Sequence, residues 1–184
     1  MALTKTEICE FGWKAVDFAL EGTDGKTYSL ADVRGAGGTV VMFICNHCPY
    51  VKAAISRIVK DMAELRAKGI GAIAIMPNDT ETHPSDSFER MKEFVAEHGV
   101  PFPYVIDRTQ ETARAYEAVC TPDYFGFDAE DGLQYRGRLD EGRDRPPPAG
   151  VRRELFEAMS GVAEGRPGPA EQTASMGCSI KWRG

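Results

Sequence analysis

The residues with the clearest capacity for chemistry are Cys45 and Cys48, which are separated by two residues in the run CNHCP. A thiolate is the nucleophile of disulfide exchange, and this spacing lets one helical turn bring the second sulfur close enough to close a disulfide. We therefore predict that Cys45 attacks or is attacked, and that Cys48 resolves the mixed disulfide. A zinc site would need two further ligands, and the sequence has no second pair with ligand spacing, so no metal is predicted.

The elements around this pair favour an ionised thiol. The β-branched run Thr39–Ile44 predicts a buried strand, and the residues from Pro49 to Lys68 have apolar side chains at helical spacing. The pair lies between the two, where unpaired N–H groups at the start of a helix stabilise negative charge. His47, when protonated, adds to this effect. We predict that the pKa of Cys45 lies below the usual value of about 8.5.

The rest of the chain alternates between apolar strands and amphipathic helices. A Gly-containing turn between Asp17–Leu20 and Lys26–Leu30 predicts a hairpin. The further predicted elements are strand Ile70–Met76, helix Asp86–His98, strand Phe102–Ile106, helix Thr109–Val119, strands Tyr124–Asp128 and Leu133–Leu139, and a helix from about Ala149 to Ala163. This order favours an α/β fold with a parallel core, one antiparallel flank and helices on both faces.

Composition narrows the class of protein. The 184 residues include 28 acidic and 22 basic side chains, and no cluster of Lys and Arg is present to bind a phosphate backbone, so nucleic acid is not an expected partner. The apolar runs are far shorter than the roughly 18–20 residues that span a bilayer, and the N-terminus lacks the apolar core of a secretory signal. We therefore expect a cytoplasmic protein with no membrane partner. Because most thiols are kept reduced in the cytoplasm, a close cysteine pair there is expected to be catalytic or metal-binding rather than structural.

Three separated segments, CNHCPYVK, CTPDYFGFD and MGCSIKW, together resemble a subgroup of the thioredoxin superfamily. This subgroup comprises redoxin or thioredoxin-like thiol-disulfide oxidoreductases related to alkyl hydroperoxide reductase and thiol-specific antioxidant proteins. The resemblance, from about Gly12 to Trp182, implies a thioredoxin-like fold with a mixed central sheet, helices on both faces and an inserted helix-strand unit near Asp86–Ile106. It also implies a redox-active Cys45–Cys48 disulfide in place of any cofactor. The implied partners are a disulfide-containing protein or a low-molecular-weight thiol, and an unidentified reductant or oxidant.

The same resemblance assigns a role to Thr121 and Pro122. In the thioredoxin pattern a cis-proline lies across from the cysteine pair, and the matching residue here is Pro122. The backbone of Thr121 would then pair with an extended substrate segment. The alternative from the residues alone is a trans proline at the entrance of a strand.

One position departs from the thioredoxin pattern. Thioredoxins carry a buried acidic residue six positions before the first cysteine, and here that position is Thr39. Asp79, which follows the predicted strand Ile70–Met76, is a candidate replacement. The alternative is that Asp79 is a solvated residue that caps a turn.

Two other functions remain open. The peroxidase pattern Pro-x-x-x-Thr/Ser-x-x-Cys fits neither cysteine. With the pattern aligned on Cys48, its Pro and Thr/Ser positions fall on Val41 and Cys45. With the pattern aligned on Cys45, they fall on Gly38 and Met42, so a thiol-dependent peroxidase is kept only as an alternative. The second alternative is a module that binds a soft metal through the cysteine pair, with His47 or Cys178 as a further ligand.

The last predicted feature is a C-terminal tail. We expect residues 165–184 to dock on a domain formed by residues 1–164, with Trp182 packed against it and Cys178 carried toward the active-site face. Cys178 would act there as packing or as a third thiol, and packing is the preferred role. Cys120, directly before Thr121, is a further accessory candidate, for which a small buried hydrophobe is the preferred role.

Overall fold

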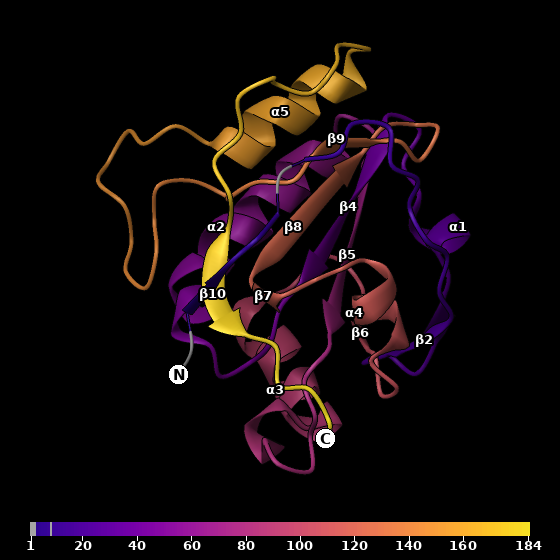
Figure 1. Cartoon of the computed structure of the whole chain (residues 1–184), viewed down its shortest axis with the longest axis vertical. Coiled ribbons are helices and arrows are strands. Elements are labelled where there is room, and N and C mark those ends of the chain that lie inside the picture. Colours follow the sequence, from indigo (N-terminus) through magenta and orange to yellow (C-terminus); the bar gives the residue numbers. More distant parts are fainter. Residues whose placement is uncertain (1–2, 8) are drawn as a thin grey trace.

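The computed structural model describes residues 3–7 and 9–184. Its centre is a seven-stranded mixed sheet in the order β3-β2-β6-β5-β4-β8-β9 (Figure 1). β4, β5 and β6 are parallel, and β8 pairs antiparallel with β4. The strands are β2 (Leu20–Gly22), β3 (Thr27–Tyr28), β4 (Gly38–Phe43), β5 (Ile70–Met76), β6 (Tyr104–Ile106), β8 (Asp123–Phe127) and β9 (Leu133–Tyr135).

The strand β4 lies inside the sheet, between β5 and β8, and is buried along its whole length. Its side chains alternate between two cores, with Val40 and Met42 on one face and Val41 and Phe43 on the other. A strand buried on both faces requires a continuous apolar run, which is what the sequence has here.

Helices cover both faces of the sheet, as predicted. On the first face, α2 (Pro49–Arg66), α3 (Phe88–His98) and α5 (Glu154–Ala163) contribute to one core. On the second, the short helices α1 (Leu30–Val33) and α4 (Glu111–Ala115) contribute to the other. Among the described residues, no helix has both the length and the hydrophobicity needed to cross a membrane.

A second, smaller sheet was not predicted. β1 (Leu3–Lys5), β10 (Met176–Ser179) and β7 (Cys120–Thr121) form three antiparallel strands in the order β1-β10-β7, with β10 drawn in yellow in Figure 1. The backbones of β10 and β7 approach closely at Gly177, where an added Cβ would lie 2.0 Å from the Thr121 carbonyl oxygen. This small sheet brings part of the predicted tail against the strand that precedes Pro122.

Two helices are shorter than predicted because of their backbone conformation. α4 begins after Gln110 and ends before Glu117, and both residues have a positive φ that a helix cannot include. Gly150 also has a positive φ, and the N-cap Arg153 has a non-helical ψ of 75°, so α5 begins only at Glu154.

Candidate active site

The cysteine pair lies where β4 ends and α2 begins. Cys45 follows the strand by two residues, and the intervening Ile44 N–H still donates to the Ile75 carbonyl of β5 at 3.0 Å. Cys48 is the N-cap residue of α2 and directly precedes Pro49. Both cysteines are fully buried, and both are thiols in this structure.

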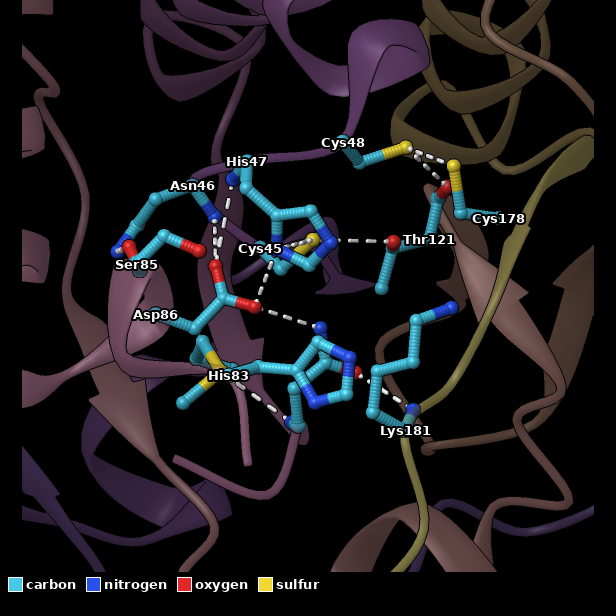
Figure 2. Close-up of polar contacts among 12 residues, drawn as sticks. Cys45, Asn46, His47, Cys48, His83, Ser85, Asp86, Thr121, Cys178 and Lys181 are labelled. Atoms are coloured by element: carbon cyan, nitrogen blue, oxygen red, sulfur yellow. Dashed lines mark hydrogen bonds and ion pairs between the residues drawn. The ribbon is translucent and has the colours of Figure 1, made fainter. Parts of the chain in front are cut away.

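Thr121 lies beside both sulfurs (Figure 2). Its Oγ1 is 3.3 Å from the Cys45 Sγ, and its carbonyl oxygen accepts a hydrogen bond from the Cys48 thiol at 3.1 Å. The peptide bond between Thr121 and Pro122 is cis, which confirms that prediction. One residue thus contacts the two sulfurs through different groups.

The backbone of Thr121 already has a partner within the chain. In the small sheet, Thr121 is opposite Cys178 of β10. A substrate segment would have to displace β10 or use the other edge of β7, so the pairing of substrate with Thr121 stays a prediction.

His47 and Asp86 form an ion pair next to Cys45. The His47 Nδ1 is 2.6 Å from the Asp86 Oδ2 and 3.9 Å from the Cys45 Sγ. Asp86 also accepts hydrogen bonds from the backbone N–H groups of Asn46 and His47, at 2.9 and 3.3 Å, and from the Asn78 amide at 2.8 Å. The Asp86 carboxylate therefore anchors both the imidazole and the loop between the cysteines.

Asp86 was missed as a site residue, and Asp79 was named in its place. Asp86 ends a 3₁₀ turn (Pro84–Asp86) in a polar segment with no apolar period, so its burial has no sequence pattern. The available signal was its position after β5, at the sheet edge where Cys45 lies. Asp79 follows the same strand, but its carboxylate accepts from the Thr82 hydroxyl at 2.7 Å and pairs with Arg183, so it fits the alternative of a turn cap.

The charges of this pair reinforce each other. Burial alone would raise the pKa of Asp86, but hydrogen bonds from His47 and Asn78 outweigh it and hold that pKa below its usual value. The Asp86 carboxylate in turn raises the pKa of His47. His47 is therefore cationic over a wider pH range than a solvated histidine.

The two thiols differ in acidity in the opposite sense to the prediction. The pKa of Cys45 is raised well above its usual value, first by its interaction with Cys48, then by burial and by the negative charge of Asp86. The hydrogen bond from Cys45, with others from Cys178 and the Val51 N–H, lowers the pKa of Cys48 to about 5 despite its burial. The predicted low pKa of Cys45 is thus wrong for this arrangement, because its interaction with Cys48, its burial and the Asp86 carboxylate all disfavour a charge on its sulfur.

Cys178 joins the site from the tail. Its Sγ is 3.0 Å from the Cys48 Sγ (Figure 2), which confirms that the tail carries Cys178 to the active-site face. Burial and the neighbouring Cys48 raise the pKa of Cys178 to about 12. Trp182 is 37% exposed and packs under the Arg114 guanidinium, 4.3 Å from the ring centroid.

Cys120 remains outside this cluster of contacts. It is fully buried in β7, and its sulfur is 3.6 Å from the Pro122 carbonyl oxygen. Burial, with the nearby Asp123, raises the pKa of its thiol. This environment fits the preferred role of a small buried hydrophobe.

Residues 11–136 match the family model described as AhpC/TSA. The chain belongs to the AhpC/TSA family. The matched residues of this AhpC/TSA protein include the cysteine pair, Asp86 and Thr121, whereas Cys178 lies outside them.

Curated relatives of this AhpC/TSA protein carry the name thiol-disulfide oxidoreductase ResA. The protein from Halalkalibacterium halodurans is 29% identical over 105 residues, which are 57% of this chain and 55% of the relative. The protein from Bacillus subtilis is 24% identical over 119 residues, 65% of this chain and 62% of the relative. The chain thus spans little more than half the length of the first of these relatives.

Solved structures agree with the fold. An uncharacterised conserved protein from Geobacillus kaustophilus has a TM-score of 0.93 and 42% identity, covering 100% of this chain and 97% of the other. A hypothetical protein from Sinorhizobium meliloti has a TM-score of 0.90 and 33% identity, covering 98% of both chains. The thioredoxin domain of a thiol-disulfide oxidoreductase from Bacteroides vulgatus has a TM-score of 0.60 and 18% identity, covering 74% and 91%. The predicted thioredoxin-like fold is confirmed.

A metal fits the AhpC/TSA protein's site poorly. Cys45, His47 and Asp86 each offer a ligand atom, and these atoms lie within 4.8 Å of one another. Both oxygens of Asp86, however, already accept hydrogen bonds, two of them from the Asn46 and His47 backbone. An ion bound there would have to break the contacts that hold the loop.

Proposed function

We propose that this AhpC/TSA protein is a thiol-disulfide oxidoreductase that works through Cys45 and Cys48. The observation that carries the proposal is the placement of both sulfurs at the start of α2, in contact with Thr121 before a cis-proline. The names of the ResA relatives support it. The chemistry requires no group beyond the two thiols.

The acidities define the first step. In the reduced pair, Cys48 is the more acidic thiol and Cys45 keeps its proton more tightly. While Cys48 is protonated, its thiol donates to the Thr121 carbonyl oxygen. When the proton moves to Cys48, the Cys45 thiolate attacks a substrate disulfide, forms a mixed disulfide and releases one substrate thiolate. The His47 cation, 3.9 Å from the Cys45 Sγ, stabilises the negative charge on the attacking sulfur.

The second step completes the transfer. Cys48 loses its proton and attacks the Cys45 sulfur, which releases the second substrate thiolate and leaves a Cys45–Cys48 disulfide. A reductant then restores both thiols by supplying two electrons and two protons. In the opposite direction, the same pair oxidises a substrate dithiol.

The substrate and compartment follow from this chemistry as part of the proposal. The substrate is a disulfide-containing protein or a low-molecular-weight thiol compound, and an unidentified reductant or oxidant in the cytoplasm completes the cycle. Cys45 is fully buried, so a substrate disulfide reaches its sulfur only if the groups around it move.

Two cysteine variants test the proposal, with reduction of insulin disulfides as the assay. Cys45→Ser is expected to abolish turnover, whereas Cys48→Ser should accumulate a mixed disulfide because only the resolving sulfur is missing. Cys120→Ser is the matched control and should keep turnover, since that buried thiol belongs to the core. Full turnover by either variant of the pair would refute the mechanism.

The same preparations separate the alternatives. Consumption of peroxide with a thiol reductant, without reduction of insulin, would indicate a thiol-dependent peroxidase instead. A bound metal at one equivalent, in protein purified under reducing conditions, would indicate the soft-metal module.

A further inference from the structure

Cys48 has a second sulfur within reach besides its partner in the pair. The Sγ atoms of Cys48 and Cys178 are 3.0 Å apart, about 1 Å more than the roughly 2.05 Å of a disulfide bond. We propose that Cys178 is a third redox thiol, which accepts the disulfide from the pair and leaves the oxidised protein with a Cys48–Cys178 bond. This inference rests on the proposed function, because the pair must first be oxidised.

The tail holds Cys178 in place on both sides. On one side, the Ser175 hydroxyl donates to the Pro122 carbonyl at 2.7 Å. On the other, the Lys181 N–H donates to the Asn78 side chain at 2.9 Å and the Lys181 carbonyl accepts from the Asp79 N–H at 2.8 Å. Cys178 is therefore part of an anchored strand.

Glycine at position 177 permits the close approach. With a side chain there, the new Cβ would collide with the Thr121 carbonyl oxygen, so β10 could not lie this near to β7. Thr121 is also the residue whose carbonyl accepts from the Cys48 thiol. Thr121 therefore lies against both segments: Gly177 of β10 packs on its carbonyl, and the Cys48 thiol donates to the same oxygen. Cys178, the residue after Gly177, is placed beside Cys48 in this way.

The step is an exchange with no net oxidation. Cys178 attacks the Cys48 sulfur of the Cys45–Cys48 disulfide, the bond between Cys45 and Cys48 breaks, and the bond between Cys48 and Cys178 forms. The proton of Cys178 ends on Cys45, which leaves as the thiolate and becomes a thiol. Two electrons stay missing from the protein throughout, so no further oxidant is required.

The charges around the three sulfurs favour this order of events. In the reduced protein, burial and, after it, the hydrogen bond and charge of the neighbouring Cys48 raise the pKa of Cys178, which stays a thiol. Once Cys48 is bound to Cys45 that charge is gone, and Cys178 ionises more readily. A disulfide at Cys48 thus makes Cys178, whose sulfur lies 3.0 Å away, a better nucleophile than it is in the reduced protein.

The consequence is a separation of roles. Cys45 exchanges disulfides with the substrate, and the oxidising equivalents are then stored between Cys48 and Cys178. The oxidised protein keeps Cys45 as a thiol beside His47. Cys48 thus stays in a disulfide through both stages, while its partner changes from Cys45 to Cys178.

Peptide mapping of the unmodified protein tests this directly. The protein is oxidised with one equivalent of oxidised glutathione, quenched in acid to stop exchange, alkylated and cleaved with trypsin. Cys45 and Cys48 share the expected peptide 35–52, whereas Cys178 lies in peptide 154–181 because the Arg166–Pro167 bond resists trypsin. A Cys45–Cys48 bond stays within one peptide, and a Cys48–Cys178 bond joins two, with alkylated Cys45 in the first.

We expect the two joined peptides in the oxidised protein, and their absence alongside an oxidised pair would overturn the third-thiol proposal alone. If neither bond forms, the proposed function fails as well. In Cys45→Ser, Cys48 can attack oxidised glutathione directly and release one glutathione thiolate, and Cys178 can then attack the glutathionylated Cys48 and release the second. Four cysteines remain in this variant, and two of their thiols should be lost on oxidation. Adding Cys178→Ser should limit that loss to the thiol of Cys48, and adding Cys120→Ser instead, as the matched control, should not.

Discussion

The two sulfurs of the pair lie next to the same residue, Thr121, but in different surroundings. Cys45 is beside a threonine hydroxyl, an imidazole and the carboxylate of Asp86. Cys48 is beside a carbonyl oxygen, a helix N-terminus and two other thiols. The order of the cysteines in the motif therefore does not by itself decide which one ionises. The interaction between the two sulfurs comes first, and the Asp86 charge beside Cys45 and the hydrogen bonds to Cys48 add to it.

The largest expected effect concerns the thiolate itself. Thiolate absorbance measured against pH should show an ionisation with a midpoint near the pKa of about 5 for Cys48. In Cys48→Ser this ionisation should disappear below about pH 8.5, because Cys45 is buried near Asp86. Cys45→Ser should keep an ionisation below that pH. The reverse result, with the acidic thiolate lost only in Cys45→Ser, would restore the sequence-based assignment.

The next effect concerns the charged pair beside Cys45. The pKa of His47 is raised in the folded protein, so its contribution to stability is complete below about pH 6.5 and is lost as the pH rises through the folded value. Asp86→Asn should lower the free energy of unfolding by about 1–3 kcal/mol near pH 6 and by less at pH 9. Urea unfolding at the two pH values measures this.

The imidazole titration gives a second reading on the same variant. Followed by NMR, the pKa of His47 should fall toward 6.5 in Asp86→Asn, because the carboxylate that raises it is gone. Asp79→Asn is the matched control and should leave the titration unchanged, since that carboxylate contacts Thr82 and Arg183. An unchanged His47 in Asp86→Asn would show that the ion pair does not govern its charge.

The smallest effect separates the two contacts of Thr121. Thr121→Val removes the hydroxyl next to Cys45 but keeps the carbonyl next to Cys48. The loss of one hydrogen bond, about 0.5–1.5 kcal/mol, should lower kcat/KM for disulfide reduction about two- to tenfold. Thr121→Ser keeps the hydroxyl and serves as the control. A shift in the Cys48 ionisation of Thr121→Val would mean that the two contacts are not independent.

The sequence predicts well those parts of the site that lie close together along the chain. A strand, a cysteine pair and a proline-initiated helix follow one another within about thirty residues, and the apolar pattern of Thr39–Ile44 predicts the burial of β4. Thr121 and Pro122 lie far from the pair in sequence, and only the resemblance to thioredoxins connected them to it.

What the sequence did not predict depends on pairing between distant segments. Met176–Ser179 is four residues long and contains glycine and serine, so it has no strand pattern, and it becomes a strand only through the small sheet with β1 and β7. Asp86 likewise lies in a polar turn. Its side chain is buried because it accepts hydrogen bonds from the loop between the two cysteines, which is distant in sequence. The carboxylate assigned from sequence, Asp79, lies seven residues earlier in the same connection.

Because β10 lies near the C-terminal end of the sequence, Cys178 is synthesised later than the rest of the site. Cys178 follows Cys48 by 130 residues. At synthesis rates of about 5–20 residues per second, the ribosome adds it roughly 10 s later. During that interval, the newborn chain already contains Cys45 and Cys48 but lacks the strand that covers Thr121. A Cys48–Cys178 disulfide therefore cannot form during that interval, whereas a Cys45–Cys48 disulfide or a mixed disulfide can.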